Sequence, residues 1–265
     1  MTSLANPVVK DIRALQLKKE RARTGLFLAE GLKLVADAIQ EGWPLKVLAF
    51  AAKVRQQPMV QRTVEAALAA GALVIEVNEA VLEKISRRDN PQMVVAVFEQ
   101  RTLPLDAVDL AGTTVWVALE TVKDPGNLGT IIRTVDSVGG AGVILVGDTT
   151  DPFALEAVRA TMGSIFHVPL AVADKAGFLA WTRRTGVSVV GTHLKGAVDY
   201  RCPAYAEPMV LLMGNEQSGL PDDLAAACAT LVKIPMAGRA DSLNLAVATG
   251  VMLYEIRRSR LGSAR

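Results

Sequence analysis

Three short segments of the C-terminal half carry glycine, amide and charged side chains beside apolar runs, a composition suited to binding and group transfer. They span residues 124–133, 212–220 and 234–248. In the second, Gly214-Asn215-Glu216 follows an apolar run, where a buried strand ends and an open α/β sheet usually binds its ligand. Glycine lets the backbone approach a ligand closely. A tight turn without a ligand is the alternative for a Gly-Asn pair.

Arg133 is the residue of the first segment best suited to handling an anion. It lies six residues after Asn127, within a predicted helix over 128–138. A guanidinium has a pKa above about 12, so it is a poor general base, but it pairs bidentately with phosphate. We interpret Arg133 as a group that positions a phosphate-bearing substrate. A structural ion pair with Asp136 or Glu120 is the alternative.

The remaining polar residues of these segments have both structural and chemical explanations. Asn127 precedes the helix predicted from Leu128, and Ser242 and Asn244 precede the last helix, so each could serve as an N-cap. Glu216 has no basic neighbour in sequence. If buried, it would need a partner, and Arg133 is the natural candidate.

Several other chemistries are disfavoured by the sequence. Gly126 and Gly129 lack the third glycine and the later acidic residue of a dinucleotide-binding fingerprint. His167 and His193 are far apart, which does not support a Ser-His-Asp hydrolase. The two cysteines have neither a CxxC partner nor a nearby histidine cluster, so we expect no structural metal and a reducing, cytoplasmic environment.

The composition is that of a globular chain with local basic character. Of 265 residues, 51% are hydrophobic and 21% are charged, which is sufficient for real cores, and the formal net charge is only +2. No apolar run reaches the ~18 residues of a membrane span, and the first residues lack a secretory signal. Basic residues gather near the N-terminus, where they could contact phosphates or form a solvated helix face: Lys10, Arg13, Lys18 and Arg23.

Strand and helix patterns alternate along the whole chain, which predicts an α/β protein. The pattern breaks between Glu99 and Gly112, so we expect an N-terminal domain over 1–104 and a C-terminal domain over 112–265. The N-terminal domain should begin with a basic helix over 5–23, and a short strand should lie near 166–169. The final helix, expected over 244–258, is apolar over more than one stripe, which suggests a second buried contact.

In order and spacing, the three segments resemble the motifs of the SpoU/TrmH family of RNA 2′-O-methyltransferases, part of the SPOUT superfamily. The resemblance covers roughly residues 112 to 258. A looser one, carried by Arg23, Gly25, Phe27, Glu30 and Gly31, relates the N-terminal segment to the ribosomal-protein-like RNA-binding domain of many members. A generic interaction module is the alternative for that segment.

This resemblance implies a small N-terminal α/β domain and a C-terminal α/β domain with a mostly parallel sheet and a deep trefoil knot. It implies catalytic roles for Arg133, Asn127, Glu216, Ser242 and Asn244. It implies that S-adenosylmethionine is the cofactor, bound by Gly214, Ile234, Leu243, Thr192, Met213 and Met236. Arg159 would join the N-terminal basic residues in binding RNA.

The expected activity is therefore methyl transfer to a ribose 2′-hydroxyl without a metal, by a homodimer with no membrane association. We expect the substrate to be large-subunit ribosomal RNA, because the N-terminal segment resembles the domains of rRNA-modifying members. Transfer RNA is the alternative substrate. A catalytically silent RNA-binding or ribosome-assembly factor of the same fold is the rival function, and the presence of all five catalytic residues weighs against it.

Overall fold

The structure is a computed structural model that describes residues 5–87, 89–112, 114–193 and 197–261. Its contacts divide the chain into two compact units. The first holds Met1–Gln100 together with Asp151–Phe166, and the second holds Arg101–Thr150 and His167–Arg265. Residues 151–166 therefore pack with the N-terminal unit, although the sequence pattern had assigned them to the C-terminal domain.

The first unit is built on a four-stranded mixed sheet. Its order is β1 (Leu26–Glu30), β4 (Val94–Glu99), β2 (Leu45–Ala51) and β3 (Leu73–Val77). β4 is antiparallel to both of its neighbours, whereas β2 and β3 are parallel. Five helices and a 3-10 turn connect and cover these strands: α1 (Pro7–Ala14), α2 (Lys18–Thr24), α3 (Leu32–Gln40), η1 (Ala52–Val54), α4 (Pro58–Ala69) and α5 (Glu79–Ser86).

The single helix expected over 5–23 is wrong, because the chain turns between α1 and α2. Leu17 is extended, with φ −92° and ψ 128°, and precedes α2 as its N-cap residue. The buried Arg21 guanidinium donates to the Leu15 carbonyl at 2.8 Å, satisfying an oxygen that the interrupted helix leaves free. The helical spacing of the apolar residues over 5–23 does not indicate this turn.

Residues 151–166 complete the core of the first unit. They form α7 (Leu155–Thr161) and the 3-10 turn η3 (Ser164–Phe166). The Phe27 ring centre lies 4.9 Å from that of Phe153 and 6.0 Å from that of Phe166. Trp43 Nε1 donates to the Phe166 carbonyl at 2.9 Å. These aromatic contacts bury large apolar surfaces and explain why the segment belongs to this unit.

Two ion pairs hold the same segment. Arg21 contacts Asp151 at 2.7 Å, with the two side chains 5% and 14% exposed. Arg159 forks onto both oxygens of Glu30 at 2.9 and 3.0 Å, and it also donates to the Ser86 carbonyl at 2.6 Å. The Glu30 side chain is only 2% exposed. An unpaired carboxylate there would be costly, so Arg159 has a clear structural role.

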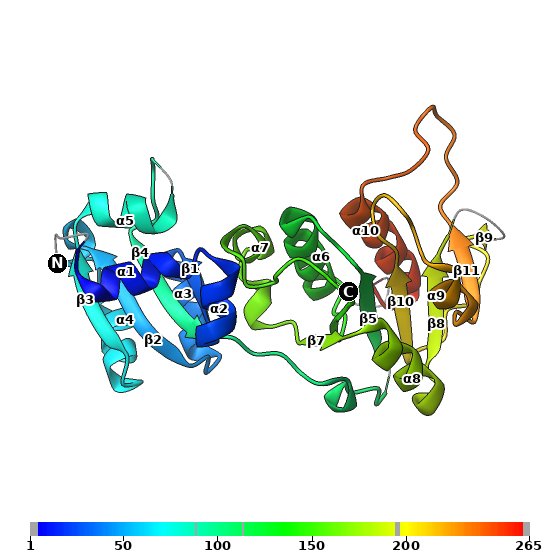
Figure 1. Ribbon diagram of the computed structural model, residues 1–265, viewed down its shortest axis with the longest axis horizontal. Helices are drawn as coiled ribbons and strands as arrows, with labels where there is room; N and C mark the ends of the chain where they lie inside the picture. The colour runs from blue at the N-terminus through cyan, green and yellow to red at the C-terminus, as the bar shows by residue number, and fades with distance from the viewer. Residues whose placement is uncertain (1–4, 88, 113, 194–196, 262–265) are drawn as a thin grey trace. The chain divides into compact units, whose positions relative to one another are not determined.

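The second unit contains a seven-stranded parallel sheet (Figure 1). Its order is β7 (Leu170–Ala173), β6 (Gly142–Val146), β5 (Val115–Glu120), β10 (Met209–Met213), β8 (Ser188–Thr192), β11 (Thr230–Lys233) and β9 (Val198–Asp199). The strand expected near 166–169 is wrong: η3 ends at Phe166, and the strand begins at Leu170. Its helices are α6 (Pro125–Ser137), α8 (Lys175–Thr185), α9 (Asp222–Ala226), α10 (Leu245–Ile256) and α11 (Arg258–Leu261), with a 3-10 turn η2 (Leu105–Ala107).

The sheet is buried on both faces, as continuous apolar strands require. Trp116, Ile144 and Leu212 share one core cluster with Phe178 and Trp181 of α8. Neighbouring strand residues point to the opposite face. There α6 and α10 pack together, with the Thr134 methyl 3.8 Å from the position that a side chain at Gly250 would occupy. Figure 1 shows α6 and α10 side by side and α8 on the other side of the sheet.

The final helix is shorter than expected and breaks at Arg257 between α10 and α11. Its buried side, which includes Met252 and Leu253, faces the unit, but Val247 and Tyr254 are each 53% exposed. The second apolar stripe seen in the sequence is therefore on the surface of this chain. Within the described residues, no helix is both long enough and apolar enough to cross a bilayer.

The Arg159–Glu30 pair generates a stability prediction. We expect Arg159→Ala to lower the free energy of unfolding of the first unit by about 3 kcal/mol, because the buried Glu30 carboxylate loses a bidentate ion pair and the Ser86 carbonyl loses a donor. Urea unfolding followed by fluorescence of Trp43, in a background with Trp116 and Trp181 replaced by Phe, measures this change. The control is Arg23→Ala, which removes an exposed pair with Glu20 and should cost less than about 1 kcal/mol. Equal effects of the two variants would contradict the buried role.

Candidate active site

The polar segments converge where β5 and β10 lie side by side in the sheet. From β5 the chain moves outward through β6 to β7, then continues on the other side of β10 with β8. Such a reversal of direction opens a crevice at the carboxyl ends of the strands, where α/β sheets bind ligands. The loop after β5 leads into α6, and the loop after β10 contains Asn215 and Glu216.

The start of α6 corrects one prediction from the sequence. Asp124, and not Asn127, is the N-cap: its carboxylate accepts from the Asn127 backbone N–H at 2.6 Å, and Pro125 follows at the first helical position. An Asp-Pro pair is a recognisable helix start. Asn127 is thus inside the first turn, and its side chain is free to make contacts outside the helix.

Three of the expected catalytic residues form one hydrogen-bonded chain. Asn127 Nδ2 donates to Glu216 Oε1 at 3.3 Å, and Asn244 Nδ2 donates to Asn127 Oδ1 at 2.9 Å. Asn244 is also the N-cap of α10, as expected, with Oδ1 accepting from the N–H groups of Ala246 and Val247. The chain therefore joins the starts of two helices to the loop after β10.

Glu216 does not pair with Arg133, the partner considered for it if it were buried. It is exposed, and its hydrogen bonds come from two amides, those of Asn127 and Asn215. Arg133 is exposed on α6, and no other described residue forms an ion pair or hydrogen bond with its guanidinium. Neither Asp136 nor Glu120 neutralises it. Its guanidinium is available to an external anion.

Ser242 is exposed two residues before the α10 N-cap. No contact of its hydroxyl with another described residue joins it to the chain of Asn127, Glu216 and Asn244. The structure thus brings three of the five expected catalytic residues into direct contact and leaves Arg133 and Ser242 on the surface of the same unit.

Gly214 allows the loop after β10 to close on itself. A β-carbon there would lie 2.4 Å from the Gly219 carbonyl carbon and 2.5 Å from the Leu220 nitrogen. Asn215 and Gly219 exchange backbone hydrogen bonds at 3.2 and 3.0 Å. Only glycine permits this approach of two backbone segments, so Gly214 has a local structural reason in addition to any contact with a ligand.

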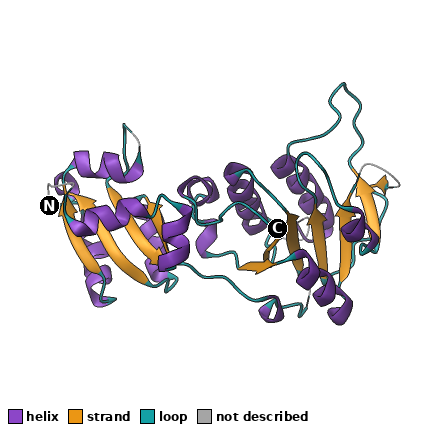
Figure 2. Cartoon of the chain, viewed as in Figure 1, coloured by secondary structure: helices purple, strands orange, loops and turns teal. Residues whose placement is uncertain are grey.

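Among the other residues expected at the cofactor, Thr192 and Met213 end β8 and β10, and the remaining three lie between β11 and α10. Thr192 Oγ1 is 3.6 Å from the sulfur of the buried Met213. Ile234, Met236 and Leu243 are half-buried in a segment that is drawn as loop throughout (Figure 2). The backbone N–H groups of these three residues make no hydrogen bond to another described residue. They lie in the segment between β11 and α10 and have no partner among the described residues.

Two side chains of this unit have shifted pKa values that argue against a role as nucleophile or general base. Burial raises the pKa of the Cys228 thiol to about 11, so the thiol is protonated at neutral pH and donates to the Leu224 carbonyl at 3.3 Å. Hydrogen bonds from Arg201 lower the pKa of Asp199 to about 2. Neither is poised as a nucleophile or base. Among the described residues, no group of three or more His, Cys, Asp or Glu is placed to hold a metal ion.

The residues expected to bind RNA have different surroundings. Lys10 and Lys18 are exposed, whereas Arg23 pairs with Glu20 and Arg159 is committed to Glu30. Arg13 lines a depression of about 350 Å³ together with Gln16, Glu83, Lys84, Arg87 and Asp89. Lys84 and Arg87 were not identified from the sequence because they lie some 70 residues after the basic N-terminal helices.

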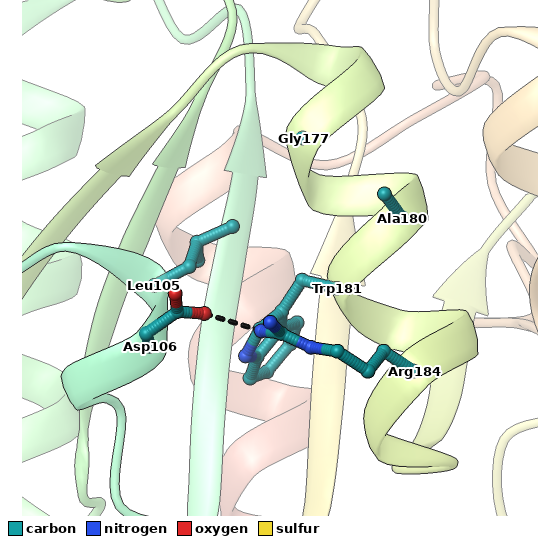
Figure 3. A pocket seen from close by; sticks show the side chains of 6 residues that line it. All are labelled: Leu105, Asp106, Gly177, Ala180, Trp181 and Arg184. Carbon is teal, nitrogen blue, oxygen red and sulfur yellow. Dashed lines mark hydrogen bonds and ion pairs between the residues drawn. The ribbon is translucent and has the colours of Figure 1, made fainter.

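A second depression, of about 290 Å³, lies away from the polar chain (Figure 3). It is formed by α8 and the turn η2, where Arg184 pairs with Asp106 beside Trp181. None of the residues predicted to do chemistry lines it. We therefore place the candidate active site at the carboxyl ends of β5 and β10.

Comparison with known families decides the assignment. Residues 114–254 match the model of the SpoU rRNA Methylase family, and residues 6–96 match the MRM3-like substrate binding domain. The chain belongs to the SpoU rRNA methylase family. The family expected from the three segments is thereby confirmed, as is the α/β fold with a mostly parallel sheet and an N-terminal domain.

Relatives of this SpoU family member match along nearly its whole length. The 23S rRNA (guanosine-2′-O)-methyltransferase RlmP of Bacillus subtilis is 31% identical, with 96% of this chain and 98% of the relative covered. A 23S rRNA (uridine-2′-O)-methyltransferase of Streptomyces viridochromogenes is 32% identical, with 92% and 86% covered.

Solved structures of family members are also similar to this chain. An AdoMet-bound rRNA methyltransferase from Sinorhizobium meliloti is 57% identical, with a TM-score of 0.93 and coverage of 98% of this chain and 97% of that chain. A TrmH/SpoU tRNA modifying enzyme of A. aeolicus is 29% identical, with a TM-score of 0.51, and covers 60% of this chain and 81% of its own.

The close approach at Gly214 predicts the effect of a single methyl group. We expect Gly214→Ala to lower the free energy of unfolding of the second unit by about 2 kcal/mol, since both contacting groups are backbone and cannot rotate away. It should also weaken binding of S-adenosylmethionine, measured by titration calorimetry. Gly238→Ala is the control, because a β-carbon at Gly238 meets nothing within 4 Å. An alanine at 214 that melts and binds like the native protein would contradict this view of the loop.

Proposed function

We propose that this protein transfers a methyl group from S-adenosylmethionine to a ribose 2′-hydroxyl of large-subunit ribosomal RNA. The observation that carries the proposal is the hydrogen-bonded chain of Asn127, Glu216 and Asn244 at the strand ends, in a family with an AdoMet-bound member of 57% identity. An RNA-directed enzyme of this kind would work in the cytoplasm, where ribosomes are assembled.

The residues around the crevice fit the cofactor. The open N–H donors of Ile234, Met236 and Leu243 match the ring nitrogens and hydroxyls of an adenosine group, and their half-buried side chains offer it an apolar surface. Gly214 keeps the neighbouring backbone close and free of side-chain bulk. When bound, S-adenosylmethionine would supply a sulfonium methyl carbon that a hydroxyl oxygen can attack without a metal, with the thioether as the leaving group and the hydroxyl proton passing to water.

The protein's own residues would act by placing the substrate. Arg133, which no described carboxylate neutralises, is suited to grip a phosphate near the target ribose with two parallel hydrogen bonds. Fixing the attacking hydroxyl in line can remove several kcal/mol of barrier. The hydrogen bonds among Asn127, Glu216 and Asn244 would fix the positions of the surrounding loops. Ser242 would line the same pocket. Arg133 is not assigned as the base, because a guanidinium does not readily give up its proton.

Ribosomal RNA is favoured over transfer RNA by the extent of similarity. The relatives named as 23S rRNA enzymes align with both units, whereas the tRNA modifying enzyme covers 60% of this chain. The N-terminal match to a substrate binding domain and the exposed cations Lys10, Lys18, Lys84 and Arg87 support an RNA contact in the first unit.

We also propose that the C-terminal part is knotted. α10 follows β11 but packs beside α6, which follows β5, and β8 and β10 lie between those two strands in the sheet. The segment 234–244 must therefore cross several strand ends on its way back. Threading through an earlier loop, a rare exception among folds, is the topology that the family resemblance implies for this crossing.

The test of the proposed reaction is methyl transfer from radiolabelled S-adenosylmethionine into separated RNA fractions. We expect label in large ribosomal RNA and a fall of at least a hundredfold in kcat for Arg133→Ala, because misplacement of the hydroxyl by about 1 Å costs that much. Arg133→Lys should remain defective, since an ammonium cannot form the bidentate fork.

The control variant is Lys123→Ala, which removes an exposed cation paired with Asp148 and should change kcat less than threefold. Label found only in transfer RNA would contradict the assignment of ribosomal RNA as the substrate. Cofactor binding with no label in any RNA or pre-ribosomal particle would favour the silent RNA-binding factor.

We propose further that the protein is a homodimer that joins through α10. Val247, Val251 and Tyr254 are spaced for one face of this helix, and the first and last are 53% exposed. An exposed apolar stripe on a helix that starts at the active site is suited to a second copy of the chain.

Sedimentation should therefore give a dimer for the native protein and a monomer for the double variant Val247→Lys, Tyr254→Lys. Introduced lysines would have to be desolvated in the interface. Val172→Lys, on the edge strand β7, removes a similarly exposed apolar residue and should leave the dimer intact. A native monomer at micromolar concentration would contradict this assembly.

A further inference from the structure

Thr121, the first residue after β5, has a backbone conformation that its side chain disfavours. Its φ is +48°. Two other non-glycine residues of the described chain share a positive φ, Arg87 and Met162, and both end helices as left-handed C-caps. That position is common at helix ends. Thr121 ends a strand and is β-branched, so its conformation is strained and must be held by its surroundings.

Three hydrogen bonds hold Thr121 in this conformation. Its N–H donates to the Val146 carbonyl of β6 at 2.9 Å, and its hydroxyl donates to Glu120 Oε1 at 2.5 Å. Its carbonyl accepts from Asn215 Nδ2 at 2.9 Å. The third bond joins the end of β5 to the loop after β10, so the strained turn directs a backbone oxygen toward that loop.

Asn215 uses every part of its side chain in this loop. Its Nδ2 also donates to Glu216 Oε2 at 3.3 Å. Its Oδ1 accepts from the N–H groups of Gln217 and Ser218 at 2.9 and 3.2 Å. The amide therefore both closes the turn and supplies one of the two hydrogen bonds that orient the Glu216 carboxylate.

We propose that Thr121 and Asn215 are positioning residues for methyl transfer. The turn at Thr121 aims its carbonyl at the Asn215 amide, and that amide orients the Glu216 carboxylate so that its other oxygen faces Asn127. Through Asn127 and Asn244 the same chain reaches the start of α10. The inference rests on the proposed methyltransferase function for its kinetic consequence, but the hydrogen-bonded chain itself is testable without turnover.

Two variants separate the positioning role from a general structural one. Asn215→Asp keeps the acceptor for Gln217 and Ser218 but replaces the donor with an oxygen that repels the Thr121 carbonyl and the Glu216 carboxylate. We expect kcat to fall at least tenfold, with KM for RNA and the calorimetric Kd for S-adenosylmethionine within threefold of native. Gln217→Ala, in the same loop, removes an exposed side chain and keeps the backbone N–H that donates to Asn215 Oδ1. It should retain kcat within threefold and melt like the native protein.

A double variant tests whether Asn215 acts through Glu216. In a Glu216→Ala background, Asn215→Asp should cause no further loss of kcat, since the carboxylate that it orients is absent. Independent, multiplying losses would overturn the inference. So would an Asn215→Asp variant with native kcat, or a Gln217→Ala variant as impaired as Asn215→Asp.

A measurement without substrate distinguishes failure of this inference from failure of the proposed function. In protein labelled with ¹⁵N-asparagine, the side-chain amide signal of Asn127 should shift on Asn215→Asp and stay in place on Gln217→Ala. An unchanged Asn127 signal in the first variant overturns the positioning chain whatever the activity. A shifted signal in a protein that methylates no RNA would support the chain and reject the reaction.

Discussion

The side-chain amide of Asn244 joins the start of α10 to the candidate active site, because its oxygen and its nitrogen each form hydrogen bonds there. Asn244 Oδ1 caps α10, while its Nδ2 holds Asn127 in the first turn of α6. Neither contact can shift without the other, because a planar amide has a fixed separation between its oxygen and nitrogen. The packing of α10 against α6 therefore sets the geometry at the carboxyl ends of the strands.

The far end of α10 is fastened as well. The Arg257 guanidinium donates to the Val138 and Gly139 carbonyls after α6 at 3.2 and 3.1 Å, and it pairs with Glu207 at 3.1 Å. A cation beside the carbonyls at the end of α6 is also favoured by the helix dipole. The Arg257 and Glu207 side chains are 11% and 8% exposed. Both ends of the α6–α10 pair are thus held by polar contacts, and apolar packing fills the space between.

The sequence predicted the parts of the site that depend on local chemistry and on order along the chain. The strand-to-loop positions of Gly214 and Glu216 and the cap at Asn244 follow from residue type. The role of Asn127 as a cap was wrong, because Asp124 with Pro125 forms a better helix start three residues earlier. The Asp-Pro pair that marks this helix start is visible in the sequence.

Other features depend on distances in space that a single sequence does not contain. Arg159 resembled an RNA contact, but Glu30, 129 positions away, occupies its guanidinium. Residues 151–166 look like an ordinary helix between two strands of the parallel sheet, yet Phe153 and Phe166 pack against Phe27 of the first unit. The sequence does not indicate that Thr121 has a positive φ, because this conformation runs against the intrinsic preference of threonine.

The distribution of charge in this unit suits the phosphate-positioning role proposed for Arg133. An exposed ion pair between Arg133 and Glu216 would contribute little stability, and it would make every incoming phosphate compete with a resident carboxylate. Instead, Glu216 receives hydrogen bonds from the neutral amides of Asn127 and Asn215. Amides can orient a carboxylate without adding a charge of their own. Glu216 is thereby held by neutral groups and does not occupy the Arg133 guanidinium, which is the arrangement that the proposed contact of Arg133 with a phosphate needs.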